Sequence, residues 1–135
     1  MTTLNDICDA LAAQIADRLP ELNCYAEEID DPRSPYVMFV ETLTPLIEYH
    51  STFEPLGTVH LQAKVSAKAA RTPDIRRQIR DLLSIGNDSS VVDAIELKTN
   101  GQALDGAVED ITCLSAEITD DGVEIFGLIV IQIQA

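Results

Sequence analysis

Two stretches of the chain repeat apolar residues at the three- and four-residue steps of an amphipathic helix. The first is expected to begin after Thr3, which can cap it, and to end at Pro20. Its apolar stripe comprises Leu4, Ile7, Cys8, Leu11, Ala12, Ile15 and Leu19. The second follows residues 72–74, where the sequence TPD supplies a cap, a first-turn proline and an acid, and it ends before Gly86. Its buried stripe comprises Ile75, Ile79, Leu82 and Leu83.

Other stretches have the period of two that is typical of β-strands. Residues 58–66 alternate cleanly, with apolar residues on one face and polar residues on the other. The apolar face comprises Val59, Leu61, Ala63 and Val65, and the polar face comprises Thr58, His60, Gln62, Lys64 and Ser66. Residues 36–40 are apolar throughout, which predicts a strand buried on both faces. A short extended piece is expected at 24–26, and Pro45 makes the segment after it an edge strand or an extended arm.

The chain ends with a predicted hairpin, in which residues 110–118 and 123–135 flank the turn sequence DDG at 120–122. The last strand is apolar on both faces, with Val123, Ile125, Ile129, Ile131 and Ile133 on one and Phe126, Leu128 and Val130 on the other. We expect such a strand to be covered on both faces, to lie inside the sheet and to pack against helices on at least one side.

A short helical turn is expected from Ser89 or Ser90 to Leu97, and turns at residues 100–101 and 105–106. The order of elements predicts an α+β fold: a mostly antiparallel or mixed β-sheet packed against two main α-helices. With 135 residues, 46% of them hydrophobic, the chain is expected to form a single domain over residues 1–135 with a real core.

Composition removes several classes of protein. The longest apolar stretch, 125–131, is too short to span a bilayer, and the early acids Asp6 and Asp9 do not suit a signal peptide. Three cysteines without a CxxC pair predict reduced, buried thiols in a cytoplasm, and they offer no zinc-ligand spacing with the two histidines.

Charge is unevenly distributed along the chain. The formal net charge is −14, from 23 acidic and 9 basic residues, which predicts a surface that repels nucleic acid and anionic membranes. Six of the nine basic residues fall within seventeen positions: Lys64, Lys68, Arg71, Arg76, Arg77 and Arg80. They predict one basic patch suited to docking on acidic protein, including another copy of the chain, or else a solvated helix face.

No pattern in the sequence indicates catalysis. His50 and Ser51 are adjacent and point apart, and His60 lies on the polar face of its strand, where a surface or interface role is expected. The acidic pairs at 27–28, 30–31 and 120–121 do not follow a calcium-loop pattern, and no phosphate-binding loop is present. Aromatic residues make up only 4%, too few for stacking single-stranded nucleic acid. We expect no enzyme activity, cofactor or metal.

The order of motifs resembles the tail terminator family of long-tailed bacteriophages. The resemblance covers most of the chain and is carried by order and spacing: the first helix ending at Leu19-Pro20, YHSTF at 49–53, the strand 58–66, the helix 74–83, and GAV at 106–108 before the hairpin. The chain departs from many relatives at 54–56, where EPL replaces a common Gly-rich link, so the shape of that loop is open.

The resemblance implies a small α+β protein that forms a ring, usually a hexamer. Such a ring caps the tail tube and joins it to the head, in a virion assembled in the host bacterial cytoplasm. The implied partners are other copies, the major tail tube protein and the head–tail connector; DNA passes through the channel without specific binding, and no membrane is involved. The family has no catalytic residues to carry over. A ring needs two different surfaces on each subunit.

We expect contact surfaces of two kinds. The basic helix face with nearby lysines can meet a neighbour's acidic loop; these residues are Arg76, Arg77, Arg80, Lys64 and Lys68, and Glu27, Glu28, Asp30 and Asp31. The loop at 49–56 is a second contact surface, through Tyr49, His50, Phe53 and Leu56. Two alternatives stay open: a head–tail connector or head-completion protein, and an acidic inhibitor that mimics DNA. The clustered arginines speak against the second.

Overall fold

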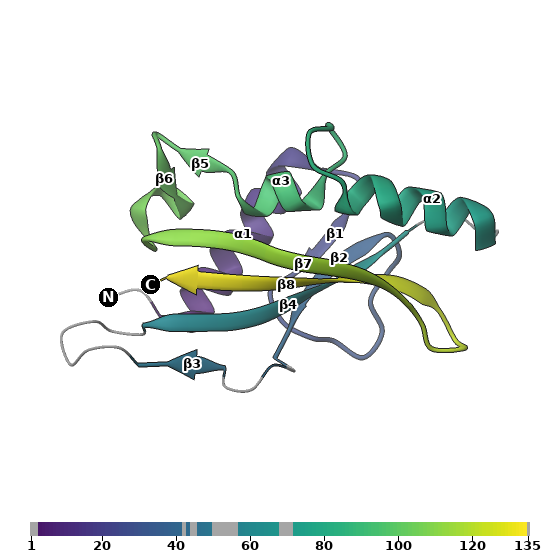
Figure 1. Ribbon diagram of the computed structural model, residues 1–135, viewed down its shortest axis with the longest axis horizontal. Coiled ribbons are helices and arrows are strands. Elements are labelled where there is room, and N and C mark those ends of the chain that lie inside the picture. Colours follow the sequence, from purple (N-terminus) through teal and green to yellow (C-terminus); the bar gives the residue numbers. More distant parts are fainter. Residues whose placement is uncertain (1–2, 42, 44–45, 50–56, 68–71, 135) are drawn as a thin grey trace.

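The computed structural model describes residues 3–41, 43, 46–49, 57–67 and 72–134 of the chain. They form a single α+β domain in which helices cover one face of a mixed sheet (Figure 1), and the predicted fold class is confirmed. The main strands, in spatial order, are β1 (Asn23–Tyr25), β2 (Tyr36–Val40), β4 (Thr58–Ser66), β8 (Ile125–Gln134) and β7 (Asp110–Asp120). β1 and β2 run parallel and the other neighbours antiparallel, and the short β3 (Ile47–Glu48) pairs with β4.

The helices begin where side chains satisfy their free amides. α1 (Leu4–Arg18) starts with a capping box: the Thr3 hydroxyl accepts from the Asp6 amide at 3.2 Å, and the Asp6 carboxylate accepts from the Thr3 amide at 3.0 Å. The second bond holds the pKa of Asp6 below its ordinary value. α3 (Val91–Ile95) is capped by the Ser90 hydroxyl, which accepts from the Asp93 amide at 3.0 Å. The prediction of Ser89 or Ser90 as its start is confirmed, although the helix ends earlier than Leu97.

α2 (Thr72–Leu83) begins within a residue of the predicted position and ends before Gly86, which has a φ of 85°. Gly127 of β8 lies directly beneath it: a Cβ there would come within 3.1 Å of the Ile79 side chain and 3.2 Å of Leu83. After α3 come a two-stranded hairpin, β5 (Lys98–Thr99) and β6 (Gln102–Ala103), and the 3₁₀ turn η1 (Leu104–Gly106). The positive φ angles of Asn100 and Gly101 form the hairpin's turn.

The main core lies between the helices and one face of the sheet. Its β4 and β8 members are fully buried: Val59, Leu61, Ala63, Val65, Ile129, Ile131 and Ile133. The alternation of residues 58–66 is confirmed, and its apolar face lies on the helix side.

The other face of the sheet, called the open face below, carries no helix in the described part of the chain. Coverage of β8 on both faces is therefore confirmed only at Phe126, which is buried; at Leu128 and Val130, which are only half-buried, the prediction was wrong. The open side of β2 is covered instead: a small cluster of Tyr36, Met38 and Val40 packs against Tyr25 and Ile29. All five residues of β2 are buried, as predicted.

The arms of the C-terminal hairpin differ from the prediction: β7 extends to Asp120, beyond the predicted 118, whereas β8 begins at Ile125, after the predicted 123. Asp121 Oδ1 accepts from the amides of Val123 and Glu124 at 2.9 Å each, which holds Val123 in the turn. Val123 is 92% exposed and lies outside β8, so its placement on the strand was wrong. The ladder also shifts register between Cys113 and Ser115, which leaves Leu114 as the extra residue of a β-bulge.

Candidate assembly surfaces

The arginines of α2 occupy one flank of the helix. The opposite flank, with Gln78 and Leu82, lines a hollow shared with Leu22 and Pro35 on the β1 side of the molecule. Leu83 instead faces β7. Residues 76, 80 and 83 follow the four- and three-residue steps that align side chains on one helix face, so Arg76 and Arg80 lie on the β7 side.

Arg77 and Arg80 are exposed and Arg76 is partly exposed. None of the three forms an ion pair with any residue that the structure describes. We call Arg76, Arg77 and Arg80 the basic flank.

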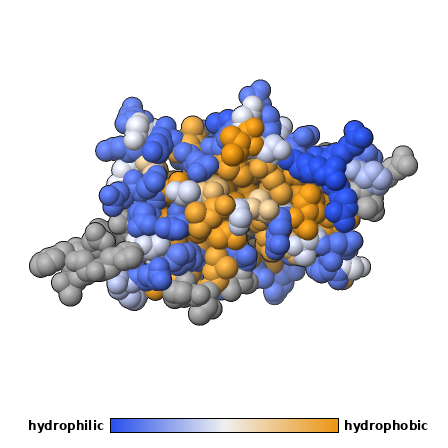
Figure 2. All heavy atoms as spheres, in the orientation of Figure 1, coloured by the Kyte–Doolittle hydropathy of each residue, from blue (hydrophilic) through white to orange (hydrophobic). Residues whose placement is uncertain are grey.

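Beside the basic flank, an apolar cleft opens between the helices and the edge strand β7. Its lining residues are Leu83, Ile85, Val92, Cys113, Leu114, Ser115, Ala116 and Ile129, and we call it the β7 cleft. Ile85 is 76% exposed and Leu114 is 54% exposed, which is unusual for side chains of this size. Figure 2 shows apolar surface gathered in the middle of this side of the molecule, bordered by hydrophilic residues. Contiguous apolar surface with a polar rim is typical of a contact site.

The predicted acidic residues Glu27, Glu28, Asp30 and Asp31 are all exposed on the loop between β1 and β2, which we call the acidic loop. Its main chain is held in place: the Arg33 amide donates to the Tyr25 hydroxyl at 3.2 Å, and Asn23 Nδ2 donates to the Arg33 carbonyl at 2.9 Å. Ile29 points inward onto the open-face cluster of β2. The four carboxylates form no ion pair with the described residues, so their charge is directed to solvent.

Lys64 does not lie with the arginines, which corrects the prediction of one basic patch. It alternates with the core residues Ala63 and Val65 and therefore lies on the open face, whereas α2 packs on the helix side. Its ammonium is 2.9 Å from Glu124 Oε1 and 4.3 Å from the centre of the Phe126 ring.

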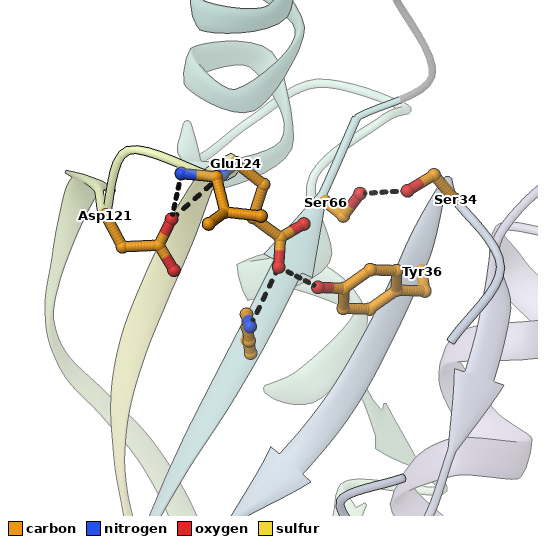
Figure 3. A network of polar contacts seen from close by, with 7 residues as sticks. Ser34, Tyr36, Ser66, Asp121 and Glu124 are labelled. Atoms are coloured by element: carbon orange, nitrogen blue, oxygen red, sulfur yellow. Dashed lines mark hydrogen bonds and ion pairs between the residues drawn. The ribbon is translucent and has the colours of Figure 1, made fainter. Parts of the chain in front are cut away.

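The same carboxylate oxygen accepts from the Tyr36 hydroxyl at 2.9 Å (Figure 3). Burial, followed by the nearby Glu124 carboxylate, raises the pKa of Tyr36 above its ordinary value. A hydrogen bond of 2.7 Å between Ser34 and Ser66 lies beside this group (Figure 3). These contacts fasten the hairpin to β2 and β4, so Lys64 is a structural residue rather than a free cation.

The remaining predicted contact residues are placed only in part. Tyr49 follows β3 and is 74% exposed, consistent with a contact role. His50, Phe53, Leu56 and Lys68 lie outside the described residues. His60 Nε2 lies 3.1 Å from Glu48 Oε2 at the open face, which gives it a partner within the sheet.

The described residues contain no cluster of three or more side chains able to hold a metal ion. Burial raises the pKa of Cys8 and Cys24 to about 11 and that of Cys113 to about 12, so the thiols are protonated at neutral pH and poor nucleophiles. None of the described helices combines the length and apolar character needed to cross a bilayer.

Sequence reasoning missed the β7 cleft. Leu114 is the one large apolar residue among the small and polar residues 112–117, and it was the available signal. Ile85 gave no signal, because it follows the end of α2, where the helical period no longer indicates which way a side chain points.

Neither a scan against protein-family models nor a search of curated proteins finds a match to this chain. Function is therefore inferred from the surfaces of this chain and from the resemblance of its motif order.

Proposed function

We propose that the chain is a structural virion protein that forms a ring at the head-proximal end of a phage tail tube. In that position it ends tube polymerisation and joins the tail to the head connector. The observation that carries the proposal is the order of elements: α1, β4, the arginine-bearing α2 and the β7–β8 hairpin follow one another as the resemblance to tail terminators implies. The α+β fold is the fold class that the resemblance implies.

The surfaces of the chain support an assembly role. The basic flank and the β7 cleft lie on one side of the molecule, and the acidic loop lies elsewhere, so each subunit carries two unlike surfaces. Unlike surfaces are what a cyclic ring of more than two copies requires, since each copy must offer one and receive the other.

The remaining charge suits a channel for DNA. A formal net charge of −14 leaves most of the surface negative once the basic flank is used in a contact. A negative lumen repels the phosphate backbone, and DNA then passes without being retained.

The proposal is tested with tail tubes assembled from a purified major tail tube protein. Adding the chain is expected to stop elongation, to shorten the length distribution, and to place a ring at one end of each tube in negative-stain images. Unchanged tube lengths, together with binding of the chain to tail-less heads, would overturn the proposal in favour of a head-completion protein. If the chain binds neither tubes nor heads and instead binds a basic enzyme as a monomer, the DNA-mimic alternative is favoured.

A further inference from the structure

The basic flank and the β7 cleft form one composite surface without a partner in the described part of the chain. Arg76 and Arg80 share the side of α2 that carries Leu83, and Leu83 lines the cleft itself. Below the cleft, the main chain of β7 from residue 115 to 119 pairs with β8 on one side and is not capped by any described side chain on the other. Only the preceding Cys113 amide is capped, by the Glu96 carboxylate at 3.3 Å.

Such a surface selects a partner that brings carboxylates next to apolar groups. Guanidinium groups pair with carboxylates through two parallel hydrogen bonds, and they lose less on desolvation than ammonium groups do. The exposed Leu114 and Ile85 supply apolar area that a purely charged ligand would leave uncovered.

The acidic loop of the same chain supplies four exposed carboxylates, with the partly exposed Ala26 and Pro32 on either side of them as apolar groups. Its main chain is fixed by the hydrogen bonds of Tyr25 and Asn23. A loop held in one conformation loses little entropy when it binds. Within one subunit, the acidic loop is too far from the basic flank to contact it. The loop joins β1 and β2 and rests on the open face, whereas the flank lies on the helix face beside β7 (Figure 1). β2 and β7 are three strand spacings apart, which is about 14 Å at about 4.8 Å each.

We propose that the basic flank and β7 cleft of one copy bind the acidic loop of a second copy, head to tail. The inference rests on the proposed function and names the contact by which its ring would form. The acidic loop and the basic flank lie toward opposite edges and on opposite faces of the sheet, so each copy carries one surface of each kind. Every contact therefore leaves a free acidic loop and a free basic flank for further copies. A two-fold contact centred on the basic flank would instead set the arginines of both copies against one another, which like-charge repulsion disfavours.

The test uses two charge-reversed variants of the full chain: Arg77→Glu/Arg80→Glu on the basic flank and Glu28→Arg/Asp30→Arg on the acidic loop. All four side chains are exposed, so the fold is expected to survive, as checked by circular dichroism. Self-association is measured by sedimentation velocity and native mass spectrometry. Each variant alone is expected to lose at least about tenfold in association constant, and an equimolar mixture to recover it in 1:1 complexes. The control Arg18→Glu/Lys98→Glu lowers the net charge by the same amount as the basic-flank variant and is expected to associate as the wild type does. It removes the ion pair of 3.8 Å between Lys98 and Asp110, which is exposed and contributes little to stability.

A weak contact is captured by cross-linking: Arg77→Cys mixed with Asp30→Cys is expected to form mixed disulfides. Val123→Cys in place of either partner serves as the control, because Val123 is exposed at the hairpin turn outside both surfaces. Wild-type behaviour of the acidic-loop variant overturns the inference, and so does a mixture that stays monomeric. A monomeric wild type that also gives no mixed disulfide overturns it as well.

The two proposals fail in different ways. If copies associate through this pair of surfaces but leave tube length unchanged, the proposed function is wrong and the contact stands. If the charge-reversed variants still form rings that end tubes, the contact is wrong and the proposed function stands.

Discussion

The helix face and the open face of the sheet are built from the same strands, yet they are covered in different ways. On the helix face, side chains of β4 and β8 such as Leu61 and Ile131 are completely removed from solvent. On the open face, their neighbours Gln62 and Val130 line a shallow groove, and polar contacts take the place of packing. Because successive residues of one strand alternate between the faces, the central strands β4 and β8 bury apolar side chains on the helix side and leave several side chains partly exposed on the other, whereas β2 is buried on both sides.

The difference teaches where substitutions matter for folding and where they matter for contacts. Burial of apolar side chains on the helix face contributes most of the favourable free energy of folding. The open face is held by a few polar anchors, among them the group formed by Lys64, Glu124 and Tyr36.

The largest effect is expected on the helix face. Leu61→Ala removes a fully buried side chain that lies opposite Ile131 in the sheet, and it leaves a cavity. We expect the free energy of unfolding to fall by about 2–5 kcal/mol, measured by urea denaturation. The matched control is Val130→Ala on the open face of β8, which is expected to cost less than about 1 kcal/mol. Equal losses for the two variants would refute the contrast between the faces.

A smaller effect tests the packing of α2 on the same face. Gly127→Ala places a methyl group 3.1 Å from the buried Ile79 side chain and 3.2 Å from that of Leu83, so these side chains must shift by a few tenths of an ångström in a packed interface. We expect a loss of about 1–3 kcal/mol in the free energy of unfolding. Leu83→Ala in the same chain makes room for the methyl group, so the double variant is expected to be more stable than the sum of the two single changes predicts. Strict additivity would show that α2 does not press on this glycine.

On the open face, Tyr36→Phe removes the hydroxyl that donates to Glu124. We expect a loss of about 1 kcal/mol near neutral pH, measured by urea denaturation.

The same variant has a pH signature. The pKa of Tyr36 is raised in the folded protein above its ordinary value of 10.0, so the contribution of its neutral form is complete below that value and is lost as pH rises above it. The wild type is therefore expected to lose stability more steeply than the Phe variant above about pH 10. Taking the difference between the two cancels the cysteines, whose raised pKa values act in the same alkaline direction. Parallel curves would contradict a role for this hydroxyl.

The smallest effect is expected from Glu48→Gln, which weakens the contact with His60 at the edge of the open face. Both side chains are partly exposed, and exposed ion pairs add little. We expect less than about 0.5 kcal/mol, with the thermal midpoint as the readout. A loss comparable to that of Tyr36→Phe would mean that β3 supports the sheet more than its two residues suggest.

Local signals in the sequence predicted most of the fold. Thr3 caps α1 as predicted, and β4 spans the residues whose alternation marked it. The predictions that failed concerned contacts between residues that are far apart in the sequence. Lys64 looked like a member of the arginine cluster because they are near in sequence, whereas its partner Glu124 comes from a hairpin sixty residues later.

The same distinction applies to the candidate surfaces: local sequence predicted one of them, and the others depend on contacts between distant residues. The basic flank followed from helical period and charge alone. The β7 cleft depends on a bulge, and the coverage of the open face depends on Ile29, an apolar residue within an acidic run. Neither feature changes the local period enough to be read without knowing which strands are neighbours.

The bulge at Leu114 sets limits on how the length of this chain can vary. Before it, odd-numbered residues such as Cys113 lie opposite Ile131 on the helix side; after it, even-numbered residues such as Ala116 take that place opposite Ile129. Losing one residue between the bulge and the turn would exchange inside for outside along the rest of the strand. Loss of Leu114 itself would leave both halves correctly facing and erase the exposed leucine of the cleft. Single-residue deletions in this hairpin are therefore expected to preserve the fold at the bulge and at the exposed turn around Val123, and to disrupt it between these two places.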